Sequence, residues 1–120
     1  MADDFSRDRD AVLAMSIEGW RFHRLFSRAL DKLDPGESAR FVNQHRFFIR
    51  RIDETLKDIG LRLVNLEHQP YDSGSAVKAL NLDEFGPGDE LVVDQMVEPV
   101  VMGDDGLVRQ GTVLLRKVEK

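Results

Sequence analysis

At 120 residues the chain is long enough for one compact domain, or for a small domain with a helical arm. Its composition is 42% hydrophobic, which is ordinary for a globular protein, and its formal net charge of −5 argues against broad nucleic-acid binding, which needs many cationic contacts to phosphate. The absence of cysteine excludes disulfides, thiolate catalysis and cysteine-based zinc sites.

The N-terminal segment is charged and lacks the apolar core of a signal peptide. No run approaches the roughly 20 apolar residues of a membrane-spanning helix. We therefore expect a soluble, cytoplasmic protein that does not bind membranes.

The first half of the sequence predicts two helices joined by a short turn. Apolar residues recur at steps of three and four from about Ser6 to Leu33, and again from about Glu37 to Ile59. Asp34-Pro35-Gly36 separates the two helices, because the residue before a proline is pushed away from helical geometry. Ser38 is a candidate cap for the second helix, and Gly60 is placed to end it. Helices joined so closely pack as antiparallel neighbours.

These two helices carry more apolar surface than they can bury against each other. We predict that a second copy of the chain covers it, so that two helical pairs form a four-helix bundle in a homodimer. The residues expected at the dimer interface lie on the apolar stripes of both helices, and they are Val12, Phe22, Phe26, Phe41, Phe48 and Ile52.

After Gly60 the apolar pattern changes from helical to alternating, which predicts short strands. Turn formers separate these strands, including the run Gly103-Asp104-Asp105-Gly106. The predicted fold class is therefore α+β, with a helical dimerisation region over residues 1–60 and a small all-β domain over residues 61–120. The strand candidates begin near Leu61, Ala76, Leu91, Met96 and Val113.

No residue pattern in the sequence predicts catalysis. His23, His45 and His68 are widely spaced and lack the spacing of metal ligands, so we interpret them as satisfied or solvent-facing. The paired carboxylates fit solvated turns and helix surfaces, and the chain has neither a Gly-x-Ser-x-Gly elbow nor a phosphate-binding glycine loop. We expect no enzyme activity, no cofactor and no metal.

Two groups of residues are candidates for binding a partner. Met96, Glu98, Pro99 and Met102, interpreted as exposed, suit a docking surface better than an active site. Arg21, Arg24 and Arg28 share one face of the first helix because they lie three and four residues apart. That face is either an ordinary solvated one or a surface for an acidic partner.

The order of parts resembles the GrpE family, the nucleotide exchange factors of DnaK-type heat-shock chaperones. The likeness spans about Leu25 to Lys117 and is carried by several short motifs. The family's long N-terminal region and most of its long paired helix have no counterpart, and the arginine of its Asn-Gly-Arg turn has no match in Gly103–Gly106. The matching motifs are Asp34-Pro35-Gly36, the helix end Thr55–Gly60, Pro70-Tyr71-Asp72, Pro87-Gly88, and Arg109 followed by Val113 and Lys117.

The resemblance implies a homodimeric co-chaperone whose β domain binds the nucleotide-binding domain of a DnaK-type chaperone and promotes ADP release. Met96 matches a methionine that the family uses for contact, while Val100 is equally well explained as strand core. The alternative is a dimeric adaptor of the same fold that binds another partner without exchanging nucleotide. The residues expected to bind the partner are Met96, Glu98, Pro99, Val100, Arg109, Arg21, Arg24 and Arg28.

Overall fold

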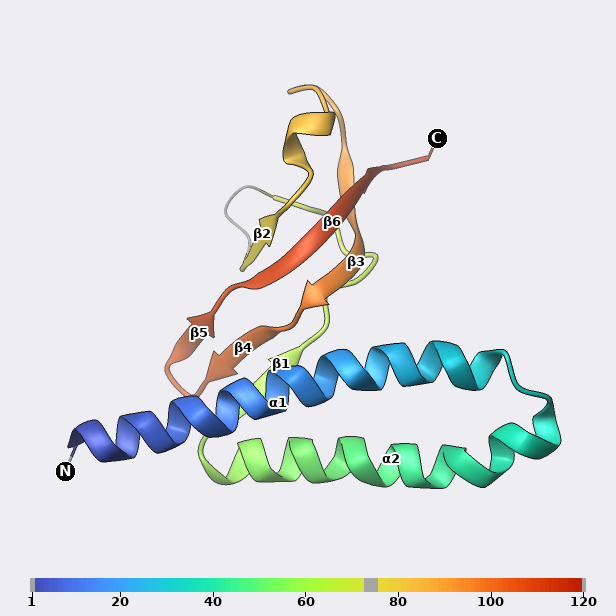
Figure 1. Ribbon diagram of the computed structural model, residues 1–120. Coiled ribbons are helices and arrows are strands. Elements are labelled where there is room, and N and C mark those ends of the chain that lie inside the picture. Colours follow the sequence, from blue (N-terminus) through green and yellow to red (C-terminus); the bar gives the residue numbers. More distant parts are fainter. Residues whose placement is uncertain (1, 73–75, 120) are drawn as a thin grey trace. The chain divides into compact units, whose positions relative to one another are not determined.

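The computed structural model describes residues 2–72 and 76–119, and the chain divides into two compact units, Met1–Gly60 and Leu61–Lys120 (Figure 1). The first unit is helical and the second is built from short strands. The predicted α+β layout is therefore confirmed.

The helical unit is a hairpin of two long helices, α1 (Ala2–Asp31) and α2 (Pro35–Asp58), which lie side by side in Figure 1. Asp34 caps α2, since its Oδ1 accepts a hydrogen bond from the backbone N–H of Glu37 at 2.9 Å. The prediction of Ser38 as the cap is wrong, because Pro35 suits the first helical position and lets the helix begin earlier.

The two helices pack closely at Gly19 of α1. A Cβ atom on Gly19 would lie 2.7 Å from Cδ1 of Ile52 and 3.4 Å from Cζ of Phe48, both on α2. The absence of a side chain therefore makes room for two apolar side chains of the neighbouring helix. At its far end α2 stops at Gly60 as predicted, with the positive φ of 76° that favours glycine after a helix.

The second unit holds two three-stranded sheets, ordered β1-β4-β5 and β2-β6-β3. The first sheet is antiparallel throughout, whereas in the second β6 runs parallel to β2 and antiparallel to β3. A single 3₁₀ turn, Leu82–Glu84, follows β2. The strands are β1 (Leu61–Val64), β2 (Val77–Ala79), β3 (Leu91–Glu98), β4 (Val100–Gly103), β5 (Gly106–Arg109) and β6 (Gly111–Lys117).

The chain changes sheets between β1 and β2, again at Pro99 between β3 and β4, and a third time at Gln110 between β5 and β6. Proline fits a position where the chain leaves a sheet, because it has no backbone N–H to donate to the hydrogen bonds between strands. β3 also carries two irregularities in register near its switch end, between Val93 and Gln95 and between Met96 and Glu98. Bulges of this kind bend a strand, which carries it from one sheet toward the other.

The free edge of β3 is covered by the segment from His68 to Tyr71. The N–H of His68 donates to the carbonyl of Val93 at 2.8 Å, and the N–H of Tyr71 donates to the carbonyl of Leu91 at 2.9 Å. His68 adopts a positive φ of 68° to make this pairing possible. The covered edge is no longer open to pairing with another strand.

Candidate functional site

β5 exposes charged and apolar side chains on the surface of the second unit, and one of them pairs with Glu98 of β3. Arg109 of β5 donates from Nη2 to Oε2 of Glu98 at 3.1 Å. Beside Arg109 in β5 lie two exposed apolar residues, Leu107 and Val108. We call Glu98, Leu107, Val108 and Arg109 the hairpin surface. It brings together two of the residues predicted to bind a partner.

Three other residues that were predicted to contact a partner are buried inside the second unit. Met96 is only 1% exposed, and Pro99 and Val100 are also fully buried. The prediction that Met96 and Pro99 are exposed is therefore wrong. Met96 is buried because it packs closely on Gly111, where a Cβ atom would lie 3.0 Å from Cε of Met96 and 3.0 Å from Cγ2 of Val100.

The bulge in β3 leaves the N–H of Met96 to be satisfied by a side chain. Oε1 of Glu67 accepts a hydrogen bond from it at 3.3 Å. Met96 is thus held by a backbone hydrogen bond as well as by the burial of its side chain.

The turn that joins β4 and β5 is acidic. Asp104 and Asp105 are exposed, and Gly106 has a φ of 123°, a conformation that residues with a Cβ rarely adopt. The turn therefore presents two carboxylates to solvent.

The three arginines predicted on one face of α1 differ in their surroundings. Arg21 pairs with Glu18 at 3.2 Å, and the Arg24 guanidinium lies 5.0 Å from the centre of the Trp20 ring. Arg28 is exposed in the last turn of α1. A cation near a helix C-terminus is favoured by the helix dipole, which explains Arg28 without a partner protein.

The helical hairpin exposes a group of aromatic side chains. Phe22 is 58% exposed, Phe41 and Phe48 are also exposed, and the ring of Phe22 stacks on that of Phe26 with 5.9 Å between centres. A shallow groove of about 140 Å³ runs between the helices here. We call this the aromatic face, and its groove is lined by Phe22, Phe26, Gln44, His45 and Phe48.

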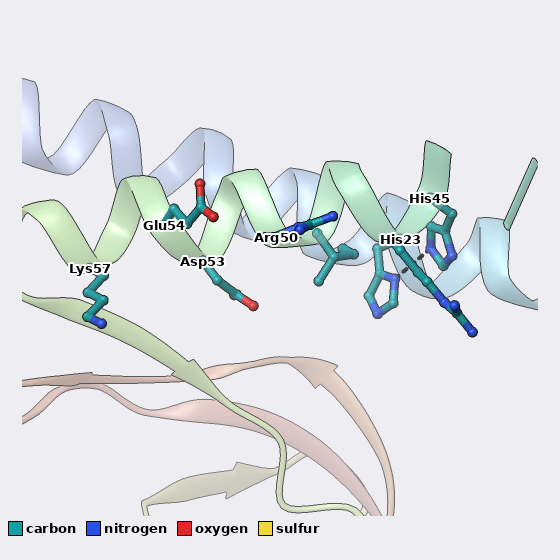
Figure 2. Close-up of a pocket in the computed structure, with 8 residues that line it drawn as sticks. His23, His45, Arg50, Asp53, Glu54 and Lys57 are labelled. Carbon is teal, nitrogen blue, oxygen red and sulfur yellow. Dashed lines mark hydrogen bonds between the residues drawn. The ribbon is translucent and has the colours of Figure 1, made fainter. Parts of the chain in front are cut away.

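Two histidines meet between the helices next to the aromatic face. Nδ1 of His23 on α1 and Nε2 of His45 on α2 are 2.7 Å apart, and one of them donates a hydrogen bond to the other (Figure 2). The ring of His45 also meets Phe26 edge to face, with 5.3 Å between centres. On its other side the pair borders an open groove of about 400 Å³, whose remaining lining residues come from α2 and are Arg46, Ile49, Arg50, Asp53, Glu54 and Lys57.

The environment of His23 disfavours its charged form. Burial lowers the pKa of His23 below its ordinary value of 6.5, and the charges of His45 and Arg24 lower it further, while Asp53 acts in the opposite direction. His23 is therefore held neutral to a lower pH than an exposed histidine.

Sequence reasoning missed both the histidine pair and the apolar part of the hairpin surface. The pair could have been found, since His23 and His45 lie eleven residues on either side of Asp34 and so come opposite each other in an antiparallel hairpin. Leu107 and Val108 gave no signal of their own, because two apolar residues after a turn are as typical of buried strand as of exposed strand.

Comparisons of the chain with protein-family models, with curated proteins and with solved structures found no match. Within residues 2–72 and 76–119, no three histidine, aspartate or glutamate side chains are grouped so that they could hold a metal ion. None of the helices in this part of the chain has the length and apolar character needed to span a bilayer.

Proposed function

We propose that the protein is a GrpE-like co-chaperone, which binds the nucleotide-binding domain of a DnaK-type heat-shock chaperone and promotes ADP release in the cytoplasm. The observation that carries the proposal is the hairpin surface, where Arg109 and Glu98 form an ion pair beside exposed Leu107 and Val108. A mixed patch of this kind, apolar with paired charge, is typical of a protein-binding site.

In this proposal the hairpin surface makes the direct contacts. Met96, Pro99 and Val100 support it from within the unit, since their side chains are buried. The surface favours ADP release only if it binds the open form of the chaperone more tightly than the closed form. Arg21, Arg24 and Arg28 are proposed to contact the partner from the helical side.

The proposed protein is a homodimer joined through the aromatic face. Exposed large aromatic side chains on one side of a helical hairpin favour burial against another apolar surface. A second hairpin of the same kind supplies such a surface and completes a four-helix bundle. Phe22, Phe41 and Phe48 lie at the centre of the proposed interface, with half-buried Val12, Phe26 and Ile52 beside them.

Release of fluorescent ADP from a DnaK-type chaperone, followed by stopped flow, tests the proposal. Saturating protein is expected to accelerate release, and Arg109→Ala is expected to reduce the acceleration at limiting protein by about fivefold or more. Arg116→Ala is the matched control, because Arg116 also forms an exposed ion pair of 3.1 Å, with Asp94 on the same unit. No acceleration by the wild-type protein would reject the exchange function. Equal losses in both variants would reject the hairpin surface as its site.

A second candidate is a dimeric adaptor that uses the same surfaces for a different partner without exchanging nucleotide. Two observations favour it: the turn carries Asp104 and Asp105 where the family has an arginine, and Met96 is buried where the family uses a methionine for contact. Affinity capture with the wild-type protein and with Arg109→Ala separates the two functions. The adaptor function is supported if the wild-type protein captures a partner that is not a chaperone ATPase and Arg109→Ala does not capture it.

A further inference from the structure

The His23–His45 hydrogen bond joins α1 to α2 through two imidazole side chains. The rings are stacked with 4.7 Å between centres, and the two nitrogens are 2.7 Å apart. A hydrogen bond between two imidazoles needs one nitrogen with a proton and one without. The contact therefore exists only while at least one of the facing nitrogens is unprotonated.

The charges around the pair make a second proton unfavourable. Arg24 lies on α1 next to His23, and Arg46 lines the adjoining groove from α2. Arg50 and Lys57 line the same groove, as Figure 2 shows. Asp53 and Glu54 line the same groove, but Glu54 pairs with Arg51 at 3.6 Å. Asp53 is the carboxylate that raises the proton affinity of His23, and the burial of His23 and the charges of His45 and Arg24 outweigh it.

We propose that the His23–His45 pair is a proton-sensitive latch of the helical hairpin, which holds α1 against α2 near neutral pH and releases them when both imidazoles are protonated. Two imidazolium rings at this separation repel each other and cannot hydrogen-bond. Because His45 also lines the groove of the aromatic face, release of the latch changes that face as well.

The direction of the pH effect follows from the lowered pKa of His23. Below about pH 6.5 the unfolded chain takes up a proton that the folded hairpin resists, so stability present above that pH is lost as the pH falls toward the folded-state pKa. Each unit by which the pKa is lowered corresponds to about a tenfold change in the folding constant.

Chemical unfolding of the full chain at about pH 7.5 and about pH 5.5 tests the latch, because the single tryptophan, Trp20, lies on α1 and reports on the hairpin. The folding constant of the wild type is expected to fall over this range, because His23 resists protonation in the folded hairpin. His45→Gln removes the partner's charge but leaves the burial of His23 and the charge of Arg24, so its folding constant is expected to fall by less than that of the wild type. His68→Asn is the matched control, since His68 lies in the other unit and asparagine accepts its positive φ; it should retain the full fall.

An NMR titration of the wild-type imidazoles gives a second measurement that does not depend on any variant folding. His23 is expected to titrate below the ordinary histidine value, and its signal is expected to respond to protonation of His45. Titration of His23 at the ordinary value, or a full pH dependence in His45→Gln, would overturn the latch. Weakening of the homodimer at low pH, measured by sedimentation, is a separate consequence that rests on the proposed function. Its absence would leave the latch standing and reject the dimer through this face.

Discussion

Asn81 takes the place of a strand residue by using its side-chain amide. Its Oδ1 accepts from the backbone N–H of Leu115 at 2.9 Å, and its Nδ2 donates to the carbonyl of the same residue at 3.0 Å. β2 ends at Ala79, so these two bonds continue the pairing with β6 past the end of the strand. A residue that usually marks a turn is here part of the sheet edge.

We expect Asn81→Ala to destabilise the β unit by about 1–3 kcal/mol, because both backbone groups of Leu115 lose their partner. Asn81→Asp keeps the shape but sets a carboxylate against the Leu115 carbonyl, so it should cost a similar amount. Hydrogen exchange at the Leu115 amide measures the effect directly. Asn65→Ala is the control: Asn65 accepts from the backbone N–H of Glu67, away from Leu115, and its loss should leave Leu115 exchange unchanged.

At the level of elements, Gly111 decides whether β6 can enter its sheet. It sits directly after Gln110, where the chain changes sheets between β5 and β6, and a Cβ on it would lie 2.9 Å from the backbone carbonyl oxygen of Glu98. The same Cβ would lie only 3.0 Å from side-chain atoms of Met96 and Val100, the residues proposed to support the hairpin surface. A backbone atom cannot move aside as a side chain can, so this position has room only for glycine.

Gly111→Ala is expected to destabilise the β unit by about 1–3 kcal/mol, the usual cost of overpacking a core. Gly88→Ala is the matched control, since no described atom lies within 4 Å of a Cβ placed there, and it should change stability by no more than about 0.5 kcal/mol. Urea denaturation followed by circular dichroism compares them. A Gly111→Ala variant as stable as Gly88→Ala would show that β6 shifts to accept the methyl group.

The elements that follow from local sequence were predicted better than those that depend on pairing. The helices were predicted from the spacing of apolar residues, and the stop at Gly60 from its chemistry. β5 was missed, because Gly106–Arg109 is a strand only through its pairing with β4. The burial of Met96 could not be foreseen either, since it depends on Gly111, which is distant in sequence and adjacent in the sheet.

At the level of the whole molecule, the aromatic face predicts self-association. Replacing both Phe22 and Phe48 by serine removes two large side chains from the proposed interface, each worth about 1.5–3 kcal/mol when fully buried. The dimer is therefore expected to weaken about a hundredfold or more, as measured by analytical ultracentrifugation.

Leu80→Ser is the control for this double variant. Leu80 is 54% exposed, close to the value for Phe22, but it belongs to the β unit. Its replacement should leave the association constant unchanged. A monomeric wild type, or equal weakening by Leu80→Ser, would exclude the aromatic face as the dimer interface.

The central place of β6 also sets the order in which a ribosome can complete this protein. The helices meet through residues close in sequence, and β1, β4 and β5 form their sheet from segments made before β6. β2 and β3 have no ladder with each other, because β6 lies between them. A nascent chain that has emerged only as far as Arg109 therefore has all three strands of the sheet β1-β4-β5, but β2 and β3 still lack β6, the strand with which both pair. Chaperone protection during synthesis matters most at that stage.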